Sequence, residues 1–161
     1  MSIPKFQNCS NPISISSSPT RSNENQFVPI DKVDSLDWVI SRSDTTALVC
    51  NNPGVWNIIL QYQLFGRKPV ESAFNSTLIG WFNINNEDVQ FSAATQDTHV
   101  IGSSNVLVIA YSSAFKKGDE VRAGIRSVSF DGDLNVEIKG NLTLAGVFAP
   151  SLIITATKTS D

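Results

Sequence analysis

Residues 51–66, NNPGVWNIILQYQLFG, constrain the fold more than any other part of the sequence. Every second residue from Trp56 is large and apolar, in the series Trp56, Ile58, Leu60, Tyr62 and Leu64. The alternate series has no charged residue and consists of Asn57, Ile59, Gln61 and Gln63. Successive side chains of a β-strand point to opposite faces, so this alternation predicts a strand whose first series lies inside a core. The second series is unusual, because the solvent face of a strand ordinarily includes charged residues.

The chain has the same β-type character from Phe27 onward. Short apolar runs are separated by Gly, Pro, Asn and Asp, and a helical period is never sustained over three turns. Strands are expected at residues 26–30, 36–41, 45–50, 55–65, 76–84, 87–92, 97–101, 104–115, 120–130, 133–139, 141–148 and 151–158. Turns are expected at residues 52–54, 66–69, 85–86, 116–119, 131–133 and 140–141. This pattern predicts an all-β fold, an antiparallel two-sheet jelly-roll sandwich.

The first 25 residues differ in composition from the rest of the chain. Their larger part, SNPISISSSPTRSNEN, is rich in Ser, Asn and Pro and poor in large apolar side chains. Such a segment buries too little apolar surface to offset the entropy lost when it becomes ordered. We therefore expect residues 1–25 to be a flexible N-terminal assembly arm that binds a neighbouring subunit or shell protein. Residues 26–161 are then expected to form one jelly-roll domain.

A second expected strand also lacks the charged residues of an ordinary solvent face. Both alternating series of Asn105–Tyr111 are largely apolar. A sandwich has only two layers, so such a strand needs a cover from another subunit or from a long loop of the same chain. Charged residues make up 17% of the sequence, below the roughly 25% of a typical soluble protein. Both observations indicate that part of the surface is covered.

Residues suited to catalysis or metal binding are sparse. His99 is the only histidine and no GxSxG motif occurs, so a serine nucleophile would lack a base. Cys9 and Cys50 have neither CxxC nor metal-site spacing, and one histidine cannot complete a two-histidine zinc site. We expect no enzyme activity and no cofactor, with His99 an ordinary surface or strand-end residue. Free thiols are the favoured state of both cysteines, and a disulfide between them is the alternative.

Oxygen-rich and aromatic residues leave binding functions open. Residues 131–133 (DGD) and 83–88 (NINNED) offer oxygen ligands for calcium, but they equally suit tight turns, which is the interpretation we favour. The three tryptophans each lie within a strand pattern, which favours core packing over a sugar-stacking platform: Trp38, Trp56 and Trp81. A carbohydrate-binding jelly-roll module that uses Trp81 and the loop at Asp131 is the alternative function.

The charge distribution narrows the range of partners. The net charge is −3 and the 12 Lys and Arg residues are scattered, whereas nucleic-acid binding needs a clustered basic surface. No apolar run approaches the roughly 18 residues that span a bilayer, and no secretory signal follows the first five residues. We expect no nucleic-acid partner and no membrane insertion.

Several short motifs resemble one family. Residues 54–61 (GVWNIILQ) and 115–121 (FKKGDEV) are similar to a strand start and a later hairpin of TNF-like and C1q-like jelly-roll domains. A second set resembles the version of this domain in structural proteins of bacteriophages and large DNA viruses: WFNIN (81–85), Ser92, GSSNV (102–106), KGD (117–119) and APSLIIT (149–155). The likeness covers roughly residues 27–158. The Phe-Gly element that ends cytokine members is replaced by residues 149–151, which speaks against a signalling role.

The resemblance implies a compact homotrimer in which one sheet of each jelly roll faces the threefold axis. By position, it places Asn57, Ile59 and Gln61 on the axis-facing side of their strand and Val108 on a neighbouring strand. Charges buried there would meet their own copies, whereas amides can hydrogen-bond to theirs and Ile59 can pack. We therefore expect a non-enzymatic viral structural protein, a trimeric component of the virion. It would be a capsid-associated protein or a spike or fibre head that contacts other virion proteins through its arm, with attachment to a host glycan or receptor as a further option.

Overall fold

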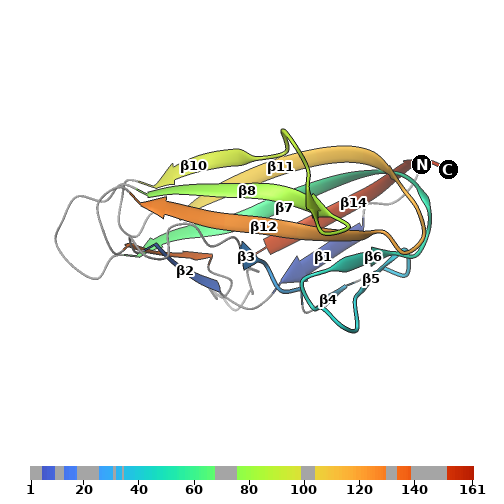
Figure 1. Cartoon of the computed structure of the whole chain (residues 1–161), viewed down its shortest axis with the longest axis horizontal. Helices are drawn as coiled ribbons and strands as arrows, with labels where there is room; N and C mark the ends of the chain where they lie inside the picture. Colours follow the sequence, from blue (N-terminus) through green and yellow to red (C-terminus); the bar gives the residue numbers. More distant parts are fainter. Residues whose placement is uncertain are drawn as a thin grey trace, which may run out of the picture.

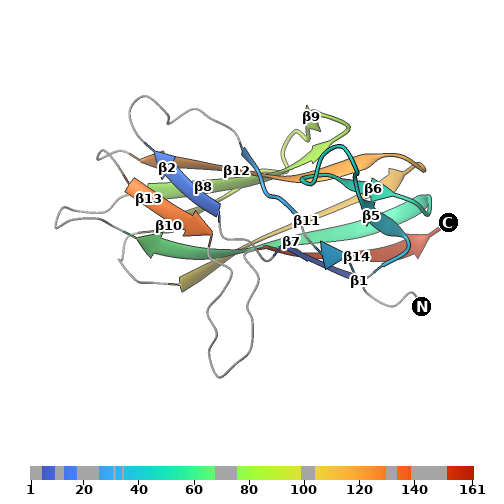
Figure 2. The same ribbon diagram turned by 90° about the horizontal axis from the view of Figure 1, so that it is seen from below.

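A computed structural model of the chain describes residues 5–9, 13–17, 26–30, 32–33, 35–67, 76–98, 104–129, 134–138 and 152–161. Every regular element in these ranges is a β-strand, and every pair of neighbouring strands is antiparallel. The strands form two sheets packed face to face, as Figures 1 and 2 show. This arrangement confirms the predicted all-β, two-sheet jelly-roll sandwich.

The first sheet has the strand order β2-β13-β7-β14-β1-β4, and β11 pairs with the remaining edge of β7. Its members are β1 (Lys5–Cys9), β2 (Ile13–Ser17), β4 (Lys32–Val33), β7 (Gly54–Arg67), β11 (Ser104–Phe115), β13 (Leu134–Ile138) and β14 (Leu152–Ser160). β7 is the longest strand and lies at the centre of the sheet. It contacts β11 along one edge, and β13 and β14 along the other.

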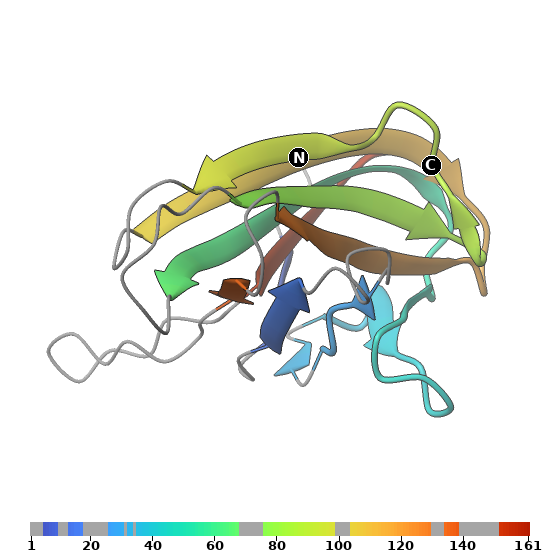
Figure 3. The ribbon, with the colours of Figure 1, turned by 60° about the vertical axis from the view of Figure 1, so that its left-hand side comes forward.

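The second sheet has the strand order β10-β8-β12-β6-β5, with β9 paired to β8 and β3 paired to β12. Its members are β3 (Gln26–Phe27), β5 (Trp38–Ile40), β6 (Leu48–Cys50), β8 (Ser76–Ile84), β9 (Glu87–Asp88), β10 (Ala94–Thr98) and β12 (Glu120–Ser129). Figure 3 shows the long strands of both sheets running along the molecule, with the short strands of the first 50 residues gathered on one side of them.

The core lies between the sheets and includes the apolar series of β7. Trp56, Ile58, Leu60 and Tyr62 are all buried, as the alternation of residues 55–65 predicts. The rings of Trp38 and Trp56 meet edge to face, with their centroids 5.6 Å apart. The Tyr62 hydroxyl donates a 2.7 Å hydrogen bond to the Gly124 carbonyl, which joins β7 of the first sheet to β12 of the second.

Several expected elements agree closely with the structure. β8 and β11 have the expected bounds, and the expected turn at residues 85–86 joins β8 to β9. Asn85 and Asn86 both have positive φ, 52° and 67°, as a tight type I′ hairpin requires. β10 begins at Ala94 rather than near residue 97, and the strand expected at 87–92 is reduced to the two residues of β9. The strand expected at 141–148 lies outside the described residues.

Two strands of the first sheet lie within the segment for which the sequence predicts a flexible arm. β1 pairs with β14 and β4, and β2 pairs with β13. The composition of residues 1–25 gives little sign of these strands, because a five-residue strand depends on its partners rather than on its own apolar content. The division into an arm and a domain at residue 25 stays a prediction.

None of the segments in the described ranges forms a helix long and apolar enough to cross a membrane.

Candidate functional site

Where its side chains are described, the outer surface of the first sheet is free of charge over its three longest strands, β7, β11 and β14. The side chains that point away from the core there are Val55, Asn57, Ile59 and Gln61 on β7, Val106, Val108, Ala110, Ser112 and Ala114 on β11, and Ile153, Thr155 and Thr157 on β14. We call these twelve residues the uncharged face. None is ionisable, and seven of them are Val, Ile or Ala.

Strand register arranges the uncharged face in rows across the sheet. Gln61 lies opposite Val108 on one side and Ile153 on the other. The next row is Ala110, Ile59 and Thr155, and the third is Ser112, Asn57 and Thr157. The four residues that the sequence places at a subunit interface, Asn57, Ile59, Gln61 and Val108, therefore lie together on one continuous surface.

The exposure of these residues shows how they differ from an ordinary solvent face. Val108 is 51% exposed and Val106 is 48% exposed. Few other large apolar side chains among the described residues are as exposed as these two. Asn57, Ile59 and Gln61 are half-buried among their neighbours. The prediction that β11 is apolar on both faces agrees with its burial pattern, because Leu107 and Ile109 are in the core and the alternate valines are not. Within the described residues, no third layer covers these valines.

Most residues of the uncharged face are not among the four that were predicted from the sequence. Val106 and Ala110 belong to the same alternate series as Val108, so the pattern of residues 104–115 was sufficient to find them. Ile153, Thr155 and Thr157 alternate with the buried residues of β14 in the same way. The sequence pattern does not show which strands are neighbours in the sheet. Only the pairing of β14 with β7 brings Ile153 beside Gln61.

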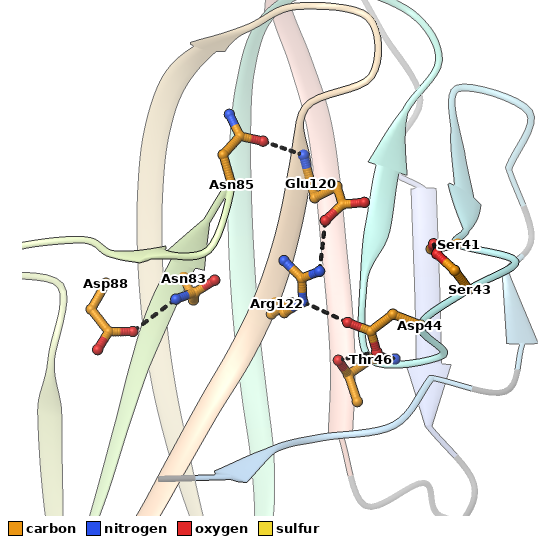
Figure 4. Close-up of polar contacts among 9 residues, drawn as sticks. All are labelled: Ser41, Ser43, Asp44, Thr46, Asn83, Asn85, Asp88, Glu120 and Arg122. Carbon is orange, nitrogen blue, oxygen red and sulfur yellow. Dashed lines mark hydrogen bonds and ion pairs between the residues drawn. The ribbon is translucent and has the colours of Figure 1, made fainter.

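The outer surface of the second sheet has the opposite character, with an ion-pair cluster at its centre (Figure 4). Arg122 on β12 is only 5% exposed, and its Nε donates to Asp44 at 2.9 Å while its Nη2 donates to Glu120 at 2.6 Å. Asp44 also accepts hydrogen bonds from the backbone N–H and the hydroxyl of Thr46. These bonds fix the loop before β6 against β12.

The charged groups of this cluster stabilise one another's ionised forms. Hydrogen bonds from the Thr46 hydroxyl and from Arg122 hold the pKa of Asp44 below its ordinary value. Burial alone would lower the pKa of Arg122, but its bonds to Asp44 and Glu120 outweigh burial and raise it. The charge of Arg122 is therefore neutralised within one chain and needs no partner subunit.

A second polar group lies beside the ion pairs, where β8 neighbours β12. Asp88 Oδ1 accepts hydrogen bonds from Trp81 Nε1 at 2.8 Å and from Asn83 Nδ2 at 2.9 Å. Asn83 lies directly opposite Arg122 in the sheet. Asn83 Oδ1 and Arg122 Nη1 are both buried without a hydrogen-bond partner among the described residues, a geometry that suits a bridging water.

The remaining candidate residues have unremarkable surroundings where the structure describes them. Trp38 and Trp56 are core residues as expected, and Trp81 is buried but lies on the outer side of the second sheet. Cys50 is a free, buried thiol whose pKa is raised by burial, which disfavours the reactive thiolate. His99, the Asp131 loop and the side chain of Cys9 lie outside the described residues. In the part of the chain that the structure describes, no three His, Cys, Asp or Glu side chains gather in a way that could hold a metal ion.

Comparison with solved structures places this architecture among TNF-like jelly rolls. Eiger TNF from S. frugiperda is 14% identical and has a TM-score of 0.54, with 99% of this chain and 94% of that chain covered. Murine APRIL is 11% identical and has a TM-score of 0.51, with 96% of this chain and 97% of that chain covered. No protein-family model and no curated protein matches the sequence. At these identities the likeness shows a TNF-like fold, and the narrower resemblance to viral versions stays a prediction.

Proposed function

We propose that the chain is the subunit of a non-enzymatic homotrimer that serves as a structural component of a virion, in the shell or in a spike or fibre head. The observation that supports the assembly is the uncharged face. A surface of twelve uncharged side chains, with Val106 and Val108 about half exposed, is unusual on a chain that places ion pairs on its opposite side.

The geometry favours a symmetric assembly. Around a symmetry axis each residue meets its own copies, so a charge would be repelled by identical charges. Amide side chains avoid that repulsion and can hydrogen-bond to their copies, and Ile59 and Val108 can pack. TNF-like folds typically form homotrimers, and three copies are therefore the number that we propose.

The virion role rests on the sequence rather than on the fold. The motifs WFNIN, GSSNV and APSLIIT resemble those of viral structural proteins, and the residues that could support catalysis are few. The segment before residue 26 provides the proposed contact with other virion proteins.

Light scattering tests the assembly on the purified chain. We expect a mass near three chains, and a monodisperse monomer would contradict the proposal. Gln61→Glu would place three like charges close together and should weaken assembly while leaving the monomer folded. Lys117→Glu, in the exposed turn between β11 and β12, is the matched control and should assemble normally.

Mass spectrometry tests the virion assignment separately. Virus particles should be purified on a density gradient from the organism or culture that produces the chain. They should contain the chain at a fixed ratio to their main shell protein. A chain that is found only outside particles would contradict the virion role and leave the trimer unaffected. A variant starting at Gln26 that enters particles as well as the full chain would contradict the role of the arm.

A further inference from the structure

The connection between β8 and β10, residues 85–93, presents an exposed aromatic ring. This segment includes β9 and projects beyond the layer formed by β8 and β12 (Figure 2). The Phe91 side chain near its end is 104% exposed, more than any other large apolar side chain on the described surface. Phe91 also has a φ of 63°, in the left-handed region that a bulky residue rarely adopts. A strained backbone that exposes an aromatic ring is typical of a binding site.

The segment around Phe91 is held in place by hydrogen bonds on both sides. Val89 N–H donates to the Phe82 carbonyl at 2.9 Å, so the loop continues the edge of β8. Ser92 Oγ donates to the Val89 carbonyl at 2.8 Å and accepts from the Phe82 N–H at 3.0 Å. The ring of Phe91 is thus presented on a fixed backbone, and little further ordering is needed when a ligand binds.

A hollow of about 260 Å³ lies next to this ring. Its apolar lining includes Ile79, Val89 and Phe91, and its polar lining includes Asp88, Gln90 and Arg126. The hollow is smaller than the roughly 300–1,000 Å³ of pockets for drug-sized ligands, so it suits a single small ring. Arg126 also interacts with other groups of the chain.

Asp88 is oriented so that it can accept a hydrogen bond from a ligand. Its Oδ1 already accepts from Trp81 and Asn83. Its second oxygen points away from Asn83 in Figure 4, and no described residue donates to it. An ionised carboxylate is acceptor-only, so this oxygen favours a ligand that brings hydroxyl donors.

We propose that this hollow binds one pyranose ring of a neutral glycan, stacked on Phe91. The apolar C–H face of the sugar would contact the exposed ring, its hydroxyls would donate to the second oxygen of Asp88, and Gln90 would offer both a donor and an acceptor. In this site the aromatic platform is Phe91, whereas the alternative function drawn from the sequence used Trp81. Trp81 also lines the hollow, but its ring is only 7% exposed and its N–H is bound to Asp88, so it offers little surface for stacking.

The chemistry of the hollow favours a neutral sugar over an anionic sugar and over a protein partner. An anionic sugar would bring its charge close to the Asp88 carboxylate, and Arg126, the cation of the lining, already interacts with other groups of the chain. A protein partner would need on the order of 1,000 Å² of complementary surface, whereas the apolar part of this site centres on one exposed ring. The site lies on the second sheet, so it does not depend on the trimer proposed for the uncharged face.

The test uses the full chain on an array of neutral and anionic glycans, followed by saturation-transfer NMR with the methyl glycosides of glucose, galactose and mannose. We expect binding to neutral glycans and saturation transfer to at least one methyl glycoside. Phe91→Ala should weaken binding about tenfold, because it removes the stacking surface. Asp88→Asn keeps the Oδ1 acceptor for Trp81 and Asn83 but loses the carboxylate charge, and should also weaken binding at least about tenfold.

The controls separate a binding role from a structural one. Leu36→Ala removes another exposed apolar side chain, 86% exposed on a different loop, and should bind glycans normally. Phe91→Ala should keep the thermal unfolding midpoint and the assembly mass of the parent, because the ring is fully exposed. The proposal is overturned if the parent binds no glycan, if it binds only anionic glycans, or if Phe91→Ala and Leu36→Ala bind equally. Loss of a protein partner in Phe91→Ala without glycan binding by the parent would also overturn it.

Discussion

The two outer surfaces of the sandwich come from similar strands and have opposite chemistry. On the first sheet, the outward side chains that the structure describes on β7, β11 and β14 are amides, hydroxyls and aliphatic groups without a single charge. On the second sheet, Arg122 is buried between two carboxylates, and Asp88 is held by Trp81 and Asn83. The second sheet pairs the charge of Arg122 with carboxylates of the same chain, and the first sheet leaves Val106 and Val108 uncovered.

This difference in charge indicates which surface is suited to contact with another subunit. Charges satisfied by their own neighbours keep a surface stable in solvent, and they cost free energy when another subunit removes them from water. An uncharged surface has no such penalty and gains free energy when it is covered. Assembly is therefore expected on the first sheet and ligand contact on the second.

The largest expected effect comes from placing a charge on the uncharged face. Val108→Glu would bury three unpaired carboxylates in the proposed trimer, at a cost of about 3–5 kcal/mol for each buried charge. Light scattering should show a fall in mass from three chains to one. Val39→Glu is the matched control, because Val39 is 41% exposed on β5 of the second sheet and should tolerate a charge. Equal masses for both variants would remove the distinction between the two surfaces.

The next largest effect compares the two faces of one strand. Leu60→Ala or Ile58→Ala truncates a fully buried side chain of β7 and should lower the free energy of unfolding by about 2–5 kcal/mol. Ile59→Ala, on the uncharged face between them, should have little effect on the unfolding of the monomer. Urea denaturation at a protein concentration too low for assembly measures both changes. A neutral Leu60→Ala would contradict the assignment of that series to the core.

A smaller effect is expected from Gly124→Ala on the second sheet. A Cβ at this position would overlap the ring of Trp81, which packs against Gly124 across the strands. Displacing this buried ring should cost about 1–3 kcal/mol and break the Trp81–Asp88 hydrogen bond. Thermal unfolding and Trp fluorescence measure the two consequences. An unchanged unfolding midpoint would show that Trp81 has room to move.

The smallest effect concerns the acid sensitivity of the ion-pair cluster. The pKa of Asp44 is lowered from an ordinary 3.8, so its contribution to stability is present above that pH and is lost as the pH falls through its lower, folded-state value. Asp44→Asn should therefore be less stable than the parent at pH 6, and the difference should be smaller at pH 3, below the ordinary pKa of 3.8. Because the Asp44 side chain is 37% exposed, we expect the difference to be less than about 1 kcal/mol. A difference that is the same at both pH values would contradict this role of Asp44.

Much of the fold was predictable because strand periodicity is a local property. The alternation of residues 55–65 identified the buried face of β7, and the double apolar series of residues 105–111 identified a strand with an uncovered second face. Asn85 and Asn86 identified a hairpin because few other residues accept positive φ in succession. The strands β1 and β2 were missed because nothing in the composition of their segment predicts a partner.

At Phe91 the prediction from the local sequence pattern was wrong. The sequence around it resembles the end of a strand, and the expected strand at 87–92 would have placed it in a sheet. The structure instead ends the strand at Asp88 and exposes the Phe91 ring on a left-handed residue. Trp81 shows the converse case, a strand residue on the outer side of a sheet that is nevertheless buried.

The sequence by itself determined the long strands and which face of each is apolar, because both follow from the two-residue period of the β-strand. It also determined that one face of residues 55–63 is uncharged. Only the tertiary structure decided which strands are neighbours, because pairing depends on packing between segments far apart in the chain. That packing brings Gln61, Val108 and Ile153 into one row of the uncharged face, and it brings Asp88 against Trp81 beside the exposed ring of Phe91.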